Sequence, residues 1–265
     1  MRITSTKNPL VRRLRDLADR PAREQEGRMV VEGVRLVEEV LDARLPVELL
    51  LYDPAEGTRD ARLAALVSKA SAAGARLIEA EPHVIAAASQ VDTPQGVLAV
   101  VEMPKPELSA ILGRPDLLLV VADRIQDPGN LGTIIRVADA AGATGVVATR
   151  GTVDPYNPKA VRASMGSLFH IPVVSCERND VIQELEARNS RVLIADQRGA
   201  VDYTAASYTP PLAIVLGGEA EGAHPDWREA AVTSVRIPLY GRAESLNVAI
   251  AAALLLYEAR RTREG

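Results

Sequence analysis

Polar side chains occur at three places where an apolar segment of the sequence ends, and their types suit anion binding and the alignment of a nucleophile. They are Asn130, Arg136, Glu219, Ser245 and Asn247. Arg136 lies in an otherwise apolar helical segment, six residues after Asn130. An arginine there is either paired within the protein or directed at an anion, which its guanidinium binds through two parallel hydrogen bonds. We favour the anion.

The four other residues have structural alternatives. Asn130 follows a Pro-Gly turn and suits the N-cap of a helix, and either Ser245 or Asn247 suits the N-cap of the C-terminal helix. Glu219 follows two glycines and suits a helix cap, an ion pair or a site carboxylate. A cap satisfies free backbone N–H groups and needs no ligand, so residue type alone does not separate these roles.

Glycines and aliphatic residues surround these polar groups. Gly217 and Gly218 end an apolar segment, and glycine permits close approach of a ligand to the backbone. A ligand held here meets backbone N–H and C=O groups and apolar side chains, which suits a flat neutral base better than a phosphate. The GxGxxG spacing of dinucleotide-binding loops is absent, which argues against a nicotinamide-dependent oxidoreductase.

The elements that carry these residues are expected to form a parallel α/β sheet. From residue 116 onward, strand and helix patterns alternate, which is typical of a parallel sheet covered on both faces. Ligands of such sheets bind beyond the carboxyl ends of the strands. The C-terminal helix is almost wholly apolar from 248 to 257, which predicts burial on most sides. We expect strands at 117–122, 145–148, 171–174, 192–195, 213–216 and 235–239, and helices at 131–141, 159–167, 180–188 and 246–260.

A smaller α/β unit precedes this sheet. Asn8-Pro9 predicts the start of a helix with Asn8 as its N-cap. Prolines and a glycine in residues 104–115 indicate a linker, so the chain divides into domains 1–103 and 116–265, as its length of 265 residues favours. We expect further helices at 34–41, 60–73 and near 84, and strands at 29–32, 47–52, 75–78 and 96–102.

Composition narrows the class of protein. Hydrophobic residues make up 47% and charged residues 25%. The N-terminal residues 1–17 contain no apolar segment of signal-peptide length, and no run of 18 apolar residues, as a membrane span would need, occurs in the sequence. One cysteine and three scattered histidines predict no internal disulfide and no metal site, and we expect a cytoplasmic protein. The net charge is −4, yet residues 1–35 carry +4. That basic segment is either a phosphate-binding surface or a solvated helix face.

Three ordered segments resemble the signature motifs of the SpoU family of RNA ribose 2′-O-methyltransferases, within the SPOUT superfamily. They are NLGTIIRVADAAG (130–142), IVLGGEAEG (214–222) and IPLYGRAESLNVAIAAALLLYEARR (237–261). The segment DPYNPKAVRASMGSLFHIPV (154–173) is also similar to that family. In the first domain, ITSTKNPLVRRLRDL, VVEGVRLVEE and TPQGVLAVV resemble the L30e-like substrate-binding domain fused to many such enzymes. Three motifs in order are far more specific than any one alone.

The resemblance implies a homodimer and a deep trefoil knot, which periodicity does not predict. The catalytic group that it implies consists of Arg136, supported by Asn130, Glu219, Ser245 and Asn247. It implies binding of S-adenosylmethionine, without a metal, against Leu216, Gly217, Gly218, Ile237, Leu239 and Leu246. RNA contacts are expected from Lys7, Arg12, Arg28 and Arg162.

The chemistry implied by the resemblance is methyl transfer to a ribose 2′-hydroxyl. A methyl sulfonium already carries a good leaving group, so the protein must position the reactants and improve the nucleophile. The family's arginine is often described as the general base. Because a guanidinium pKa lies above about 12, we favour Arg136 as a charged clamp on RNA phosphate and on the developing 2′-oxyanion. Ribosomal RNA is the expected substrate; transfer RNA, or a non-catalytic RNA-binding protein on the same fold, are the alternatives.

Overall fold

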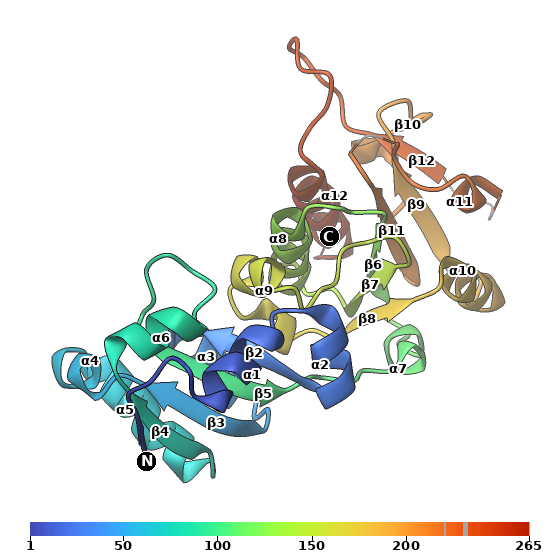
Figure 1. The fold of residues 1–265 in the computed structure, drawn as a ribbon. Helices are drawn as coiled ribbons and strands as arrows, with labels where there is room; N and C mark the ends of the chain where they lie inside the picture. Colours follow the sequence, from blue (N-terminus) through green and yellow to red (C-terminus); the bar gives the residue numbers. More distant parts are fainter. Residues whose placement is uncertain (220, 230–232, 265) are drawn as a thin grey trace. The chain divides into compact units, whose positions relative to one another are not determined.

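Two β-sheets organise the chain, one in each of two units (Figure 1). The computed structural model describes residues 1–219, 221–229 and 233–264. Unit 1 comprises Met1–Pro104 and Tyr156–Phe169, and unit 2 comprises Lys105–Pro155 and His170–Gly265. Residues 156–169, which the sequence analysis placed in the second domain, therefore pack with unit 1.

The sheet of unit 1 is mixed and has five strands in the order β1-β4-β3-β5-β2. β4 is parallel to β1 and β3, whereas β5 is antiparallel to β3 and β2. All four predicted strands are present, together with a short N-terminal strand. The bounds are β1 (Arg2–Ile3), β2 (Arg28–Glu32), β3 (Val47–Tyr52), β4 (Arg76–Ala80) and β5 (Val97–Glu102).

Helices cover both faces of this sheet. Successive strand side chains alternate between faces, so Leu49 and Leu51 pack with α1 and α6, whereas Leu50 packs with α3 and α5. Asn8 caps α1 as predicted, accepting a 2.9 Å hydrogen bond from the N–H of Leu10. The helices of unit 1 are α1 (Pro9–Asp16), α2 (Arg20–Glu26), α3 (Val34–Asp42), α4 (Pro54–Arg59), α5 (Ala61–Ala72), α6 (Pro82–Ala88) and α9 (Pro158–Ser164).

The sheet of unit 2 has seven strands, all parallel, in the order β10-β12-β9-β11-β6-β7-β8. The predicted parallel sheet is thus confirmed. The bounds are β6 (Leu118–Asp123), β7 (Gly145–Thr149), β8 (Val173–Cys176), β9 (Arg191–Ala195), β10 (Val201–Asp202), β11 (Leu212–Gly217) and β12 (Thr233–Arg236). The strand expected at 235–239 ends at Arg236, and the residues that follow it form a loop.

Both faces of this second sheet are also covered. On one face Leu119 and Val121 pack with α7, α10 and the fully buried Trp227. Leu118 and Val120 point the other way, and α8 and α12 pack against each other and against β7 and β11. The helices of unit 2 are α7 (Leu108–Leu112), α8 (Pro128–Ala140), α10 (Arg178–Ala187), α11 (Asp226–Glu229) and α12 (Val248–Glu264).

Two expectations of the sequence analysis are wrong in this unit. Residues 104–115 are not a plain linker, because they contain α7, whose Ile111 and Leu112 are buried in the core. α12 is not buried on most sides of the single chain. Ile250, Leu254 and Tyr257 are 54%, 36% and 55% exposed, and their spacing of four and three residues puts them on one face. None of the described helices is long and apolar enough to cross a membrane.

Candidate functional site

Hydrogen bonds between three side chains link the loops that follow β6, β11 and β12. Asn130, at the start of α8, donates a hydrogen bond from Nδ2 to Oε1 of Glu219, in the loop after β11. The Oδ1 of Asn130 accepts a 2.9 Å hydrogen bond from Nδ2 of Asn247, at the start of α12. The structure thus brings together one polar residue from each of the three motif segments, at the carboxyl edge of a parallel sheet.

The side chain of Asn130 can make these two hydrogen bonds because it does not cap its helix. Asp127 is the N-cap of α8, and its Oδ1 accepts a 2.9 Å hydrogen bond from the backbone N–H of Asn130. The alternative of Asn130 as the N-cap is therefore wrong: Asp127 directly precedes Pro128, which occupies the first helical turn. Asn247 has both roles at once, since its Oδ1 also accepts a 2.9 Å hydrogen bond from the N–H of Ala249.

Arg136 lies exposed on α8, between the buried Ile135 and the half-buried Val137. Its guanidinium makes no hydrogen bond or ion pair with any residue in the described part of the chain. An internal ion pair, the structural alternative, is therefore not formed among these residues. An exposed and uncompensated guanidinium is free to bind an anion. Ser245 is likewise exposed and unbonded within the described ranges, so the cap of α12 is Asn247 alone.

Gly217 and Gly218 sit where the backbone after β11 folds closely against neighbouring backbone. A Cβ on Gly217 would overlap the backbone N of Ala223, and a Cβ on Gly218 would lie 2.6 Å from the carbonyl oxygen of Arg124. The N–H of Gly222 donates a 2.8 Å hydrogen bond back to the carbonyl of Gly218. In this structure the two glycines allow close approach of the protein's own backbone, at Ala223 and Arg124.

The loop between β12 and α12 leaves its backbone free. In Figure 1 it extends away from both elements, and residues 237–246 make no hydrogen bond with any described residue. Ile237, Leu239 and Leu246 are half-buried, and Leu216, at the end of β11, is fully buried. Free N–H and C=O groups beside aliphatic side chains are the groups that hold a purine base. Their binding of a nucleoside-type cofactor stays a prediction, with which these free backbone groups are compatible.

The basic residues expected to contact RNA differ in their surroundings. Lys7 is exposed, and its ammonium has no partner among the described residues; Arg12 is exposed and lies 3.7 Å from Asp16. Arg28 is held between two carboxylates, 3.6 Å from Glu48 and 3.7 Å from Glu102. Arg162 lies half-buried in α9, which belongs to unit 1. The fold thus leaves Lys7 and Arg12 open to a ligand and largely neutralises Arg28.

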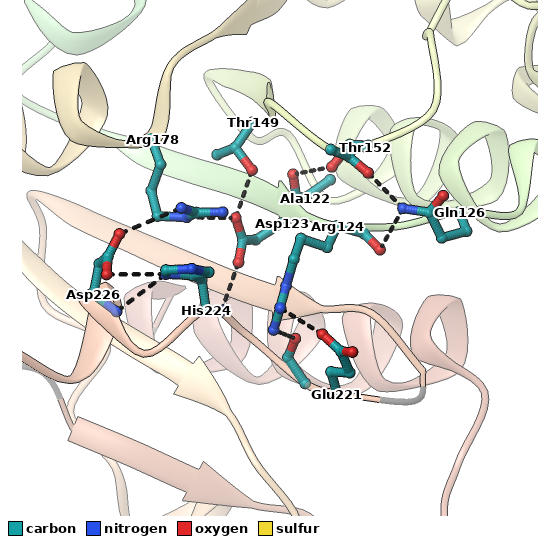
Figure 2. A network of polar contacts seen from close by, with 12 residues as sticks. Ala122, Asp123, Arg124, Gln126, Thr149, Thr152, Arg178, Glu221, His224 and Asp226 are labelled. Atoms are coloured by element: carbon teal, nitrogen blue, oxygen red, sulfur yellow. Dashed lines mark hydrogen bonds and ion pairs between the residues drawn. The ribbon is translucent and has the colours of Figure 1, made fainter.

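Sequence reasoning missed a second polar cluster, at the end of β6 (Figure 2). Asp123 is 0% exposed and accepts hydrogen bonds from Thr149, from the backbone N–H of His224 and from Arg178. Burial alone would raise the pKa of Asp123, but these three donors outweigh it and lower the pKa below its usual value. The signal in the sequence was a carboxylate at the end of an otherwise apolar strand, LLVVAD.

The surroundings of His170, His224 and Cys176 suit structural roles rather than catalytic ones. His170 lies 3.3 Å from Asp139, and His224 lies 3.0 Å from Asp226. Burial, together with Asp180 and Glu177, raises the pKa of Cys176 to about 11, so its thiol stays protonated and unreactive at neutral pH. No group of three or more His, Cys, Asp or Glu side chains suited to a metal ion occurs among residues 1–219, 221–229 and 233–264.

Comparison with known proteins gives two matched regions. Residues 117–257 match the SpoU rRNA Methylase family, and residues 8–99 match the MRM3-like substrate binding domain. The chain is 35% identical over 259 residues to the 23S rRNA (guanosine(2553)-2′-O)-methyltransferase RlmP of Bacillus subtilis, covering 97% of this chain and 98% of that protein. It is 37% identical over 253 residues to the 23S rRNA (uridine(2479)-2′-O)-methyltransferase of Streptomyces viridochromogenes, covering 93% and 87%.

A solved structure supports the same relationship. The AdoMet-bound rRNA methyltransferase from Sinorhizobium meliloti superposes with a TM-score of 0.89 at 35% identity, over 99% of this chain and 98% of that one. The similarity spans both units. The region matched to the methylase family contains the three hydrogen-bonded residues Asn130, Glu219 and Asn247. The chain therefore belongs to the SpoU rRNA methylase family.

Proposed function

We propose that this protein transfers a methyl group from S-adenosylmethionine to a ribose 2′-hydroxyl of ribosomal RNA. The observation that carries the proposal is the pair of hydrogen bonds that joins Glu219, Asn130 and Asn247, one residue from each motif segment. Arg136 lies exposed on the same helix as Asn130. The sequence relatives named as 23S rRNA 2′-O-methyltransferases support ribosomal RNA as the substrate class.

Arg136 is the residue that we assign to the RNA. Its guanidinium is exposed and has no partner among the described residues, and a guanidinium keeps its positive charge at neutral pH. It holds the phosphate next to the reacting ribose and stabilises negative charge on the 2′-oxygen as the proton leaves. Placing a fixed cation where charge develops is the largest single contribution that such sites make to catalysis.

Glu219, Asn130 and Asn247 hold the loops that surround the reacting ribose. Asn130 uses its amide N–H for Glu219 and its amide oxygen for Asn247, so its carboxamide has only one orientation that satisfies both partners. Ser245, exposed two residues before Asn247, completes the proposed group.

We assign S-adenosylmethionine to the strand-end residues Leu216, Gly217, Gly218, Ile237, Leu239 and Leu246. The AdoMet-bound relative from Sinorhizobium meliloti supports this assignment. When bound, the cofactor supplies an electrophilic methyl group on a sulfonium. The protein's part is to hold an adenine-sized base through the free backbone of residues 237–246 and to keep water away with the three half-buried aliphatic side chains of that loop.

A homodimer is part of the proposal. The face of α12 formed by Ile250, Leu254 and Tyr257 is apolar and exposed, and beside it lies a hollow of about 370 Å³ whose lining includes Tyr203 and Leu254. Exposed apolar side chains grouped on one helix face are typical of an interface. A second copy of this chain, packed through α12, would cover them and would complete the burial that the apolar sequence of this helix predicts.

The arrangement of elements in unit 2 supports one further part of the proposal. β12 lies outside β9 in the sheet, yet α12 packs on α8 and β11, so the chain between them returns across the carboxyl edge. We propose that this return passes through a trefoil knot. We also propose that residues 1–103 bind the RNA substrate, that residues 116–265 carry out methyl transfer, and that both act in the cytoplasm on ribosomal RNA.

Methyl transfer to defined RNAs tests the function. The purified protein is incubated with tritium-labelled S-adenosylmethionine and either ribosomal RNA or transfer RNA, and the product is digested to nucleosides. We expect label in a 2′-O-methylnucleoside from ribosomal RNA and none with Arg136→Ala. Label in transfer RNA alone would contradict the substrate class. RNA binding without any transfer would favour the non-catalytic alternative.

A further inference from the structure

The end of β6 carries two charged residues that the proposed mechanism does not use. Asp123 is fully buried, and Arg124 follows it with a backbone φ of +62°. Figure 2 shows their side chains leaving the strand in different directions, with the dashed contacts of both reaching the loop that follows β11. Two consecutive residues therefore hold this loop from two sides.

Asp123 anchors the far end of the loop. Its Oδ2 accepts a 2.7 Å hydrogen bond from the backbone N–H of His224, while its Oδ1 accepts from Thr149 at 2.5 Å and from Arg178 at 3.0 Å. Arg178 also contacts Asp226 at 3.3 Å, two residues beyond His224. A buried carboxylate is tolerated only where such donors satisfy it. The donors here come from three different segments, which this one carboxylate ties together.

Arg124 anchors the near end. Its Nη1 donates a 2.6 Å hydrogen bond to Oε2 of Glu221, and its Nη2 donates a 2.9 Å hydrogen bond to the carbonyl of Gly222. The backbone of Arg124 also lies close to this loop, because a Cβ added to Gly218 would be only 2.6 Å from the Arg124 carbonyl oxygen. These contacts to residues 218, 221 and 222 lie on both sides of Glu219 in the sequence.

The backbone of Arg124 has an unfavourable conformation, which its contacts with neighbouring residues maintain. A positive φ is uncommon for a residue other than glycine and persists where surrounding contacts determine it. Gln126 supplies one such contact, donating from Nε2 to the Arg124 carbonyl at 3.3 Å and also to the carbonyl of Gly151. Thr152 supplies a neighbouring one, from Oγ1 to the carbonyl of Ala122 at 2.9 Å. The loop after β7 thus fixes Arg124, and Arg124 in turn fixes the loop after β11.

We propose that Asp123 and Arg124 are positioning residues, which together hold the loop after β11 so that Glu219 reaches Asn130 and the Gly217-Gly218 turn keeps its shape. This inference rests on the proposed function, because it assigns the loop to the methyl-transfer site. Neither residue needs to touch the cofactor or the RNA. Their effect on the single-turnover rate passes through Glu219, and their effect on cofactor affinity passes through the glycine turn.

The first test compares Arg124→Ala with Arg188→Ala. Arg188 is a matched control, since it also donates to a glutamate, Glu184 at 2.9 Å, but lies at the end of α10. We expect Arg124→Ala to raise the Kd for S-adenosylmethionine by about tenfold and to lower the single-turnover rate at saturating cofactor by a similar factor, the size associated with a lost charge-assisted hydrogen bond. RNA affinity and the unfolding midpoint should match those of Arg188→Ala.

A double variant separates positioning from direct contact. If Arg124 acts through Glu219, the single-turnover rate of Arg124→Ala combined with Glu219→Gln equals that of Glu219→Gln alone. If the two losses multiply, or if Arg124→Ala weakens RNA binding instead of cofactor binding, Arg124 contacts a substrate directly and the proposal is wrong. Asp123→Asn provides a second arm: it presents an N–H to donors, and we expect it to raise the cofactor Kd in a protein that still folds.

The outcomes also distinguish this inference from the proposed function. A wild-type protein that neither binds S-adenosylmethionine nor methylates RNA would contradict the proposed function, and the inference would fall with it. A wild-type protein that does both, with Arg124→Ala and Asp123→Asn lowering only the unfolding midpoint, would overturn the inference alone and make the cluster purely structural.

Discussion

Asn247 donates a 2.9 Å hydrogen bond to Asn130 across 117 residues of sequence. The same side chain caps α12 through its oxygen, so the start of the C-terminal helix and the start of α8 are fixed by one carboxamide. Because Asn130 also binds Glu219, a shift of any one of the three loops is transmitted to the other two. Glu219, Asn130 and Asn247 therefore form one connected unit, to which Arg136 and Ser245 are not hydrogen-bonded among the described residues.

The two roles of Asn247 are separable by substitution. Asn247→Asp keeps the capping oxygen and removes the donor to Asn130, whereas Asn247→Ala removes both. We expect the aspartate variant to keep wild-type stability and to lose about tenfold in single-turnover rate, as for one lost hydrogen bond. The alanine variant should lose the same activity and also about 1 kcal/mol of stability, the usual contribution of an N-cap. Urea unfolding and rate measurements check this; equal rates for wild type and Asn247→Asp would contradict the assignment.

Arg136→Lys separates a clamp from a general base. Lysine keeps the charge but loses the planar fork that binds an oxyanion at two points. A clamp predicts a rate lowered about 10²–10³-fold, as when an oxyanion donor is removed, at every pH. A base predicts activity that rises towards the lysine pKa, because lysine deprotonates more easily than arginine. Single-turnover rates from neutral to alkaline pH decide the matter, and recovery at high pH would contradict the clamp. Stability should be unchanged within about 0.5 kcal/mol, since Arg136 is exposed.

Gly218 tests the tight turn after β11. A Cβ added to Gly218 would lie 2.6 Å from the carbonyl oxygen of Arg124, which is too close for an ordinary contact. Even Gly218→Ala should therefore displace the loop, abolish measurable cofactor binding and cost about 1–3 kcal/mol of stability. Gly57→Ala is the control, because nothing lies within 4 Å of its added Cβ. Calorimetry that finds unchanged cofactor affinity in Gly218→Ala would show that the turn tolerates displacement.

The basic surface of unit 1 is tested by salt dependence. Lys7, Arg12 and Arg15 are exposed, and only Arg12 has a nearby carboxylate, at 3.7 Å, among the described residues. Replacing all three by alanine should lower the log–log salt slope of RNA binding by roughly 0.7–0.9 for each lost phosphate contact and leave cofactor affinity unchanged. Arg28→Ala is the control, because Glu48 and Glu102 already hold its guanidinium. An unchanged slope in the triple variant would make this segment a solvated helix face.

The exposed face of α12 predicts the oligomeric state. Leu254→Glu places a charge in the middle of the apolar face, and burying it against a second copy would be costly. We expect sedimentation to show a dimer for the wild type and a monomer for Leu254→Glu. Ala65→Glu, on the exposed side of α5, should remain a dimer. A monomeric wild type would contradict the proposed homodimer.

Much of the fold follows from local patterns. The strand at 47–52 and the Asn8 cap agree with the structure, because a short apolar run and capping chemistry both depend on near neighbours. The cap of α8 could not be chosen in the same way, since Asp127 and Asn130 both suit an N-cap. The contacts of Asp123 and Asn130 join residues 101 and 89 positions apart, and no spacing rule covers such distances. The exposure of one face of α12 could not be predicted, because residue types alone do not separate an apolar face that is buried in the core from one that is exposed in the single chain.

Ribose methylation in cellular RNA tests the central claim most directly. RNA from cells with the gene intact, deleted, and deleted but complemented with Arg136→Ala is mapped for 2′-O-methylated nucleotides. We predict one position in the large-subunit ribosomal RNA that is methylated in the first strain and unmethylated in the other two, with the wild-type gene restoring it. An identical methylation pattern in all strains, or a loss confined to transfer RNA, would contradict the account.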